Sequence, residues 1–101
     1  MIWKKQPTET QIAALNSNLV VRSLENLSSY TAQTLIDTAL NAGHKILITS
    51  CTGGNRISDL PEVTAGTYVV IPNSYYIKLI VFGVNGKIYM YDGNSWQTNG
   101  A

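Results

Sequence analysis

The sequence carries little charge. Acidic and basic residues make up 13% of its 101 positions and leave a formal net charge of +1. The seven Lys and Arg residues are scattered and form no stripe, so the electrostatic footprint of a nucleic-acid-binding protein is missing. Thr, Asn, Ser and Gly replace charge with a neutral surface that can form hydrogen bonds. We therefore expect no nucleic-acid partner.

Cysteine and histidine each occur once. A single Cys51 excludes an intrachain disulfide and a zinc site with several thiolates. His44 and Cys51 could act as a nucleophilic pair only within hydrogen-bond reach. Seven positions along a predicted strand separate them by about 23 Å and place them on opposite faces. We therefore expect no metal, no cofactor and no enzyme activity.

Long apolar runs are absent as well. No run approaches the roughly 20 residues that span a bilayer, and the first seven residues lack the apolar stretch of a secretory signal. We therefore expect a soluble chain with no membrane partner. The sequence contains no repeat, no low-complexity segment and no linker rich in Pro or Gly. Residues 1–101 are predicted to form one small domain.

Two helices are predicted in the N-terminal half. The first covers about residues 9–17 and follows Thr8, which is the expected N-cap. The second covers residues 30–42, because apolar residues recur there at helical spacing and Gly43 can supply a left-handed stop. The segment 19–27 between them could be helical or irregular.

The C-terminal half reads as antiparallel sheet. Short apolar runs at 45–51 and 66–72 are typical of strands, and a hairpin pattern follows at 75–92. The turn at 92–95 then delivers Trp96 to a last short strand or tail. The predicted fold class is α+β, with the N-terminal helices packed on an antiparallel β-meander of three to five strands.

The hairpin pattern predicts a register. Asn85 and Gly86 lie between two β-branched and aromatic runs, which favours a two-residue type I′ turn that pairs Val81 with Met90. One face would then carry Ile80, Phe82, Val84, Tyr89 and Tyr91. The other would carry Ile77, Leu79, Val81, Ile88 and Met90. Because neither face is polar, helices would cover one, and a second sheet or another subunit would cover the other. We identify the second set as the candidate subunit interface.

Two polar segments each have a functional and a structural interpretation. The Thr-Gly-Gly-Asn-Arg segment at 52–56 could hold an anion, but the rest of a phosphate-binding loop is missing, which favours a simple strand-exit turn. Asp59 and Glu62 could bind a cation or form an acid and base pair. No third oxygen-rich cluster accompanies them, so solvated loop carboxylates are the favoured interpretation.

Aromatic residues gather in the C-terminal half beside Asn, Asp and Ser. Such rings could stack on sugars while amides bond hydroxyl groups, without any titrating residue. Packing in a core or an interface is the favoured alternative for Tyr89 and Tyr91. Tyr76, Trp96 and Asn94 are the candidate ligand-binding residues.

Two stretches carry a resemblance. Residues 65–72 (Ala-Gly-Thr-Tyr-Val-Val-Ile-Pro) and 86–96 (Gly-Lys-Ile-Tyr-Met-Tyr-Asp-Gly-Asn-Ser-Trp) resemble short β-modules of bacteriophage tail fibres and tail-tip proteins, over about a third of the chain. The resemblance implies a virion location, a homo-oligomer with a trimer favoured, and contacts with other virion proteins or a host-surface glycan. The expected function is a phage or prophage tail-associated structural protein that self-associates and binds a host-surface ligand.

Two alternatives remain open. A small monomeric phage-encoded protein that binds and modulates one host protein would differ in assembly state. The residues at 1–5 and 15–18 are similar to the opening of hotdog-fold acyl-CoA thioesterases, which implies an enzyme that depends on His44 or Asp37. This chain departs from that family, because Lys45 and a strand-like run follow its histidine where a His-Gly-Gly segment and a long helix are required.

Overall fold

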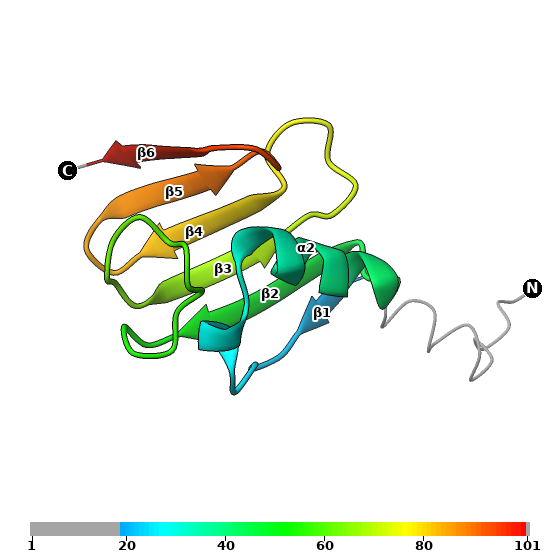
Figure 1. Ribbon diagram of the computed structural model, residues 1–101, viewed down its shortest axis with the longest axis horizontal. Coiled ribbons are helices and arrows are strands. Elements are labelled where there is room, and N and C mark those ends of the chain that lie inside the picture. The colour runs from blue at the N-terminus through cyan, green and yellow to red at the C-terminus, as the bar shows by residue number, and fades with distance from the viewer. Residues whose placement is uncertain (1–18, 101) are drawn as a thin grey trace, which may run out of the picture.

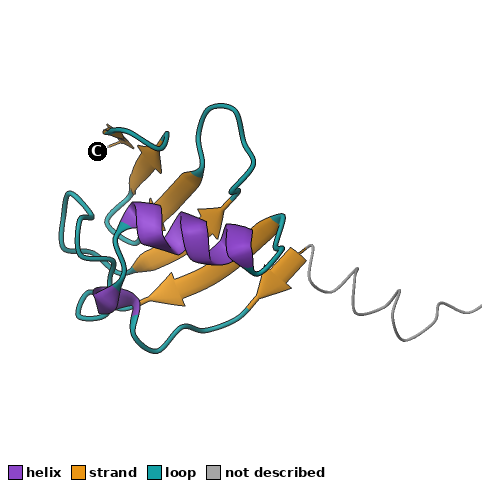
Figure 2. Ribbon diagram, turned by 45° about the vertical axis from the view of Figure 1, so that its right-hand side comes forward, coloured by secondary structure: helices purple, strands orange, loops and turns teal. Residues whose placement is uncertain are grey.

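The protein forms one helical layer on one face of a six-stranded mixed sheet, as Figures 1 and 2 show. The structure is a computed structural model that describes residues 19–100. Its elements are β1 (Leu19–Val21), the 3₁₀ helix η1 (Leu27–Ser29), α2 (Ala32–Asn41), β2 (Ile46–Cys51), β3 (Gly66–Val70), β4 (Leu79–Gly83), β5 (Lys87–Tyr91) and β6 (Trp96–Gly100). The α+β class is as predicted. The helix expected at 9–17 lies outside the described residues.

The strands lie side by side in chain order. β2 to β6 form an antiparallel meander, whereas β1 pairs with β2 in parallel, and α2 lies in the connection between those two strands. The strand at Leu19–Val21 corrects the expectation of helix or irregular structure at 19–27. Three residues are too few to show an alternating pattern. In the structure this segment is extended where it pairs with β2, from Leu19 beside Ile46 onward.

Helix α2 confirms the second predicted helix with slightly shorter bounds. Thr31 is its N-cap: the Oγ1 of Thr31 accepts from the N–H of Thr34 at 3.2 Å, and the Oγ1 of Thr34 accepts from the N–H of Thr31 at 2.7 Å. This reciprocal pair satisfies two backbone donors that a helix start would otherwise leave free. Gly43 follows the helix with φ +79, which is the left-handed stop expected of it.

The core lies between the sheet and a layer made of α2 and the loop at 52–65 (Figure 2). Its larger members from these parts are Leu35, Ile36, Leu47, Ile57, Leu60, Tyr68, Val70, Leu79, Val81 and Tyr89. Full burial of such a side chain stabilises the folded state by about 1.5–3 kcal/mol. The loop therefore contributes to the core together with the helix, through Ile57 and Leu60.

Tyr68 joins the central strand to this loop. Its side chain is fully buried, and its hydroxyl oxygen accepts from the N–H of Ile57 at 3.2 Å. Burial raises the pKa of the Tyr68 hydroxyl, and a hydrogen bond with the Cys51 thiol raises it further. Tyr68 thus stays neutral and satisfies a backbone donor that would otherwise be buried without a partner.

The β4–β5 hairpin differs from the predicted register by one residue. Val81 pairs with Tyr89 rather than Met90, and the connection is the three-residue loop 84–86. Gly86 has φ +84, whereas no non-glycine residue of the described chain has a positive φ, so Asn85 cannot take its place in a type I′ turn. A loop that ends on a left-handed glycine is the next commonest hairpin connection. The shift exchanges which side chains of β5 share a face with those of β4.

Candidate functional site

The sheet has a second face, which no described element covers. Side chains alternate along each strand, so the residues opposite to those that contact α2 and the loop lie together on this face. We call it the open face. Its members, placed by the strand registers, are Leu19, Val21, Ile46, Ile48, Ser50, Thr67, Val69, Ile80, Phe82, Ile88, Met90, Gln97 and Asn99.

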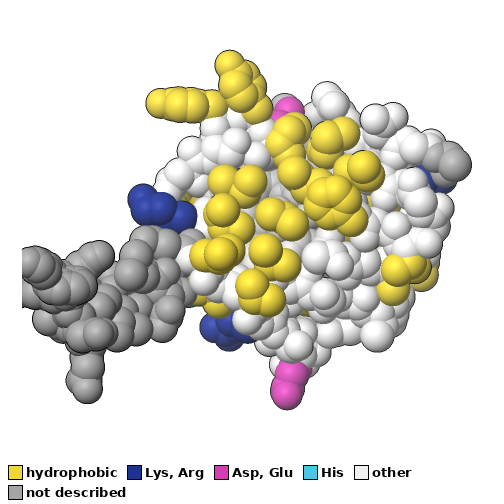
Figure 3. All heavy atoms as spheres, turned by 180° about the vertical axis from the view of Figure 1, so that it is seen from behind, with side chains coloured by type: hydrophobic (Ala, Val, Ile, Leu, Met, Phe, Trp, Pro, Cys, Tyr) yellow, Lys and Arg dark blue, Asp and Glu magenta, His cyan; other side chains and the backbone are white. Residues whose placement is uncertain are grey.

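An apolar row crosses five of the six strands on the open face. The register places Val21, Ile48, Val69, Ile80 and Met90 in one row over five adjacent strands. Figure 3 shows hydrophobic side chains gathered over the middle of this side of the molecule, with charged groups at its margins. None of the described side chains that belong to the open face is charged. The face therefore offers apolar contact and almost no electrostatic preference.

The open face is comparable in size to the largest apolar patch of a typical monomer. Six strands at about 4.8 Å spacing and five residues at about 3.3 Å each give a footprint on the order of 450 Å². The largest apolar patch on a typical monomer covers roughly 300–600 Å² and is often functional. At its borders, Val21 is 72% exposed, Leu19 54% and Phe82 47%. Contact with another surface would remove this apolar area from water.

The structure separates the five residues predicted as a subunit interface. Leu79 and Val81 are fully buried beneath the helical layer, so they belong to the core of the chain itself. Ile88 and Met90 lie on the open face, and Ile77 is half-buried just before β4. The one-residue shift of the hairpin is the reason, because a slip of one position moves a strand's side chains to the opposite face.

The three predicted ligand-binding residues do not share one site. Tyr76 is 80% exposed in the loop between β3 and β4. Trp96 packs instead against the edge of the core, with its ring centroid 5.1 Å from that of Tyr91. Asn94 lies in the exposed turn after β5, where its N–H donates to the Asp92 carboxylate at 2.8 Å. Hydrogen bonds from the N–H of Ser95 and then that of Asn94 lower the pKa of the Asp92 carboxyl.

Tyr76 lines a shallow cleft at the margin of the open face. The cleft has a volume of about 510 Å³. Its lining residues are Lys45, Ile46, Ile71, Asn73, Ser74, Tyr75 and Tyr76. Neither Trp96 nor Asn94 is among them. Tyr75, Asn73 and Lys45 were not predicted as members of this cleft, although the adjacent pair of tyrosines was an available signal.

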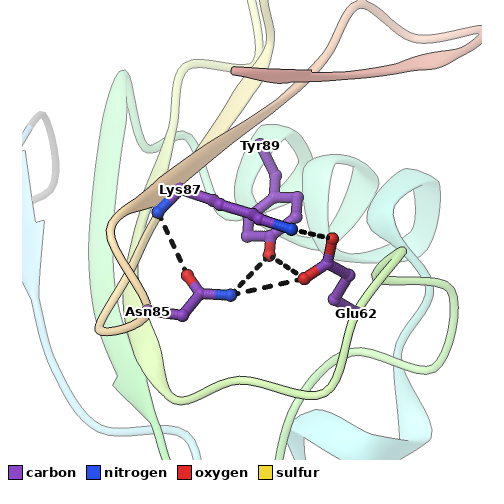
Figure 4. A network of polar contacts seen from close by, with 4 residues as sticks. All are labelled: Glu62, Asn85, Lys87 and Tyr89. Carbon is purple, nitrogen blue, oxygen red and sulfur yellow. Dashed lines mark hydrogen bonds and ion pairs between the residues drawn. The ribbon is translucent and has the colours of Figure 1, made fainter. Parts of the chain in front are cut away.

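A polar network joins the 52–65 loop to the hairpin, as Figure 4 shows. The Nζ of Lys87 lies 2.6 Å from Oε1 of Glu62, and the buried hydroxyl of Tyr89 donates to Oε2 of Glu62 at 3.1 Å. The side-chain amide of Asn85 donates to Tyr89 at 2.9 Å and to Oε2 of Glu62 at 3.4 Å. Its oxygen accepts from the N–H of Lys87 at 3.1 Å. Every member thus has a partner within the network.

The electrostatics of the network identify it as a structural clamp. Hydrogen bonds from Lys87 and then Tyr89 lower the pKa of the Glu62 carboxyl, and the bond with Glu62 raises the pKa of Lys87. Glu62 therefore stays ionised near neutral pH and cannot act as a general acid there. Its two oxygens already accept from three side chains, which also leaves little capacity to hold a cation.

The other polar candidates of that loop also have structural partners. Asp59 accepts from the N–H of Ala32 at 2.8 Å, so it supports the start of α2 and does not join Glu62 in a pair. In the 52–56 segment, the side chain of Asn55 bonds the N–H of Ser28 and the carbonyl of Leu24, each at 3.2 Å. Arg56 donates to the carbonyl of Gly53 at 2.8 Å. These contacts agree with a strand-exit turn.

The groups considered for catalysis lie apart. Cys51 is the last residue of β2, whereas His44 lies two residues before its start. Asp37 is exposed on α2, where it accepts from the side chain of Gln33 at 3.0 Å. A cavity of about 60 Å³ beside α2 is lined in part by His44 but not by Asp37. Ligand pockets are usually about 300–1,000 Å³, so this cavity is small for an acyl thioester.

Within residues 19–100, no group of three or more His, Cys, Asp or Glu side chains could hold a metal ion. None of the helices described there is both long and apolar enough to cross a membrane. Family models, curated proteins and solved structures were compared with the chain, and none of them matches it.

Proposed function

We propose that this protein is a structural module that self-associates through its open face. The observation that carries the proposal is the apolar, uncharged row over β1 to β5 that no described element covers. Two twisted sheets that stack face to face at about 10 Å separation bury such rows against each other. Burial of that area removes apolar surface from water, which is the main driving force of association.

A second copy suits this face better than a partner of opposite charge. The open face has no charged side chain among its described members, so charge complementarity gives no partner an advantage. A copy of the chain presents the same apolar surface, and a two-fold contact requires a surface that is complementary to itself. Each copy has one open face, and the open faces of two copies cover each other, so the simplest assembly is a two-fold dimer. The trimer implied by the tail-fibre resemblance stays a prediction that the measured mass tests.

The resemblance to phage tail modules extends the proposal to a place of action. Its two stretches fall on β3 and on the segment from Gly86 to the start of β6. Those segments belong to the sheet that carries the open face. We therefore propose a phage or prophage virion protein, associated with the tail, whose role is assembly and contact rather than catalysis.

Light scattering behind size exclusion over a dilution series tests self-association. The full chain is expected to have a mass above that of one subunit, and Ile80→Asp is expected to raise the dissociation constant at least about 100-fold, because it places a charge in the centre of the contact. Val63→Asp is the matched control, since Val63 is 71% exposed in the loop on the other side of the sheet.

A monomeric mass of the unmodified chain at every concentration would overturn self-association. The same open face would then favour the second candidate function, a monomer that binds one other protein. A mass that Ile80→Asp and Val63→Asp lower equally would also overturn the proposal, because it would place the contact elsewhere. The first result would mean that the chain does not assemble with itself, and the second that it assembles through a surface other than the open face.

A further inference from the structure

The loop that carries Tyr75 and Tyr76 is held in shape by its own hydrogen bonds. The Nζ of Lys78 donates to the carbonyl of Ser74 at 2.7 Å and reaches that of Pro72 at 3.5 Å. The N–H of Ser74 donates to the carbonyl of Ile71 at 3.1 Å, and the N–H of Tyr76 bonds the Oγ of Ser74 at 3.3 Å. A ligand that binds a loop ordered in this way loses little affinity to ordering it.

Both tyrosines are presented to solvent by this ordered loop. Tyr75 is 96% exposed and Tyr76 is 80% exposed, whereas Tyr68 and Tyr89 in the sheet are fully buried. An aromatic ring left in water on a fixed turn contributes almost nothing to the core. The same ring offers an apolar face for stacking and a hydroxyl group for hydrogen bonds. The pair therefore forms a platform, which we define as Tyr75 and Tyr76.

The cleft beside the platform combines three kinds of group. Ile46 and Ile71 supply apolar contact, Asn73 and Ser74 supply hydrogen-bond donors and acceptors, and Lys45 supplies an exposed positive charge. No acidic residue is among the lining residues. A ligand that matches these groups has an apolar ring face, several hydroxyl groups and a negative charge.

We propose that this cleft binds a saccharide that carries a carboxylate or a phosphate group. The sugar ring stacks on the platform, its hydroxyl groups bond Asn73 and Ser74, and its anionic group lies against Lys45. Such a saccharide would be the host-surface ligand that the expected function includes. Its binding does not require self-association, because the cleft is complete within one chain.

A peptide fits this cleft less well than a saccharide. Peptides are commonly bound by the free backbone groups of an exposed strand. Around the cleft, however, the N–H groups of Ile71, Ser74, Tyr76 and Lys78 are already bonded within the protein. The remaining recognition groups are side chains that suit the ring faces and hydroxyl groups of a sugar.

Calorimetric or NMR titration of the full chain tests the proposal. The probes are trigalacturonic acid, its methyl ester and glucose 6-phosphate. The acid is expected to bind at least about tenfold more tightly than the ester, and Lys45→Gln is expected to remove that difference. Tyr75→Ala and Tyr76→Ala are each expected to weaken binding of the acid about tenfold. Arg22→Gln and Val84→Ala change exposed residues outside the cleft and are expected to leave the affinity unchanged.

Four results would overturn the inference. They are no binding of either anionic probe at about 10 mM, equal affinity for the acid and its ester, an affinity that the tyrosine substitutions do not change, and a loss of assembly mass in solution caused by these substitutions. The last result would place the platform in a contact between copies. Titration of Ile80→Asp separates the two proposals, since the cleft is expected to bind the acid in that variant even when self-association is lost.

Discussion

The two faces of the sheet are similar in composition and differ in what covers them. The covered face contributes Leu, Val and Tyr side chains to a core closed by α2 and the 52–65 loop. The open face carries Leu, Val, Ile, Phe and Met, with no described element above it. Hydrophobicity therefore shows that both faces are apolar, but it does not indicate which one the chain itself covers.

Strand β4 gives the sharpest form of this comparison. Ile80 and Val81 are consecutive β-branched residues of one strand, and they point to opposite faces. Val81 is fully buried within the fold, whereas Ile80 is half-buried among its neighbours on the open face. Substitutions at these two positions should therefore separate folding from assembly.

The largest effect is expected for Val81→Asp. This change places a carboxylate in the core without a partner, and we expect it to lower the free energy of unfolding by more than about 4 kcal/mol. Thermal denaturation followed by circular dichroism measures this loss, with Ile80→Asp as its counterpart. Ile80→Asp should leave a folded monomer. Comparable unfolding of both variants would mean that the two faces are equally part of the subunit core.

A smaller effect is expected from the removal of single hydroxyl groups. Tyr68→Phe deprives the buried N–H of Ile57 of its acceptor, and we expect a loss of about 1–3 kcal/mol in the free energy of unfolding. Tyr76→Phe changes an exposed ring at the margin of the open face and should alter stability by less than about 0.5 kcal/mol. Urea denaturation of both variants checks the difference. Equal losses would show that the Tyr68 hydroxyl is not a required acceptor.

A substitution at the start of α2 tests how the helical layer is held on the sheet. Asp59→Ala removes the acceptor for the N–H of Ala32, and we expect the free energy of unfolding to fall by about 1 kcal/mol. Asp37→Ala is the control, because its exposed carboxylate bonds only to Gln33 on the same helix. The expectation fails if urea midpoints of the two variants shift by the same amount.

The smallest effect concerns pH. Because the pKa of Glu62 is lowered below its ordinary value of 4.5 in the folded state, its contribution to stability is present above about pH 4.5 and lost as the pH falls through the folded pKa. The pKa of Lys87 is raised in the folded state, so its pH dependence runs the other way. The contribution of Lys87 to stability is complete below its ordinary pKa of 10.5 and is lost as the pH rises through the folded pKa.

Stability curves measured between acid and neutral pH check the Glu62 contribution. The unmodified chain should lose stability relative to Glu62→Gln as the pH falls below about 4.5. Parallel curves for the two proteins would show that the carboxylate does not stabilise the hairpin.

The elements that local patterns predict well are those with their own periodicity or turn residues. Helix α2 and strands β2 to β5 follow apolar spacing and the glycine at the helix end. The hairpin register could not be derived in this way, because Asn-Gly is compatible with a two-residue and a three-residue loop. The backbone decides between them: Gly86 has a positive φ and Asn85 does not, which excludes the two-residue type I′ turn. The short β1 depends on its partner β2 rather than on its own sequence.

The candidate site was predictable in kind but not in place. The composition of the hairpin predicted an apolar face that needs a partner. Which residues form that face could be assigned only from the observed strand register. The sequence alone could not separate buried from exposed aromatic residues, because Tyr68 and Tyr76 differ only in their tertiary surroundings. Burial is a property of the folded chain, and the same residue type serves in the core and at the surface.

The order of the strands has a consequence for how the chain folds. From β2 to β6 each strand pairs with the next one along the chain, through the connections 52–65, 71–78, 84–86 and 92–95, and pairing across shorter connections lowers the entropic barrier to folding. The parallel contact of β1 with β2 must instead close the longer connection that contains α2, and within the described residues it pairs three positions of each strand. We therefore expect β1 to join the sheet last and to exchange its amide hydrogens first.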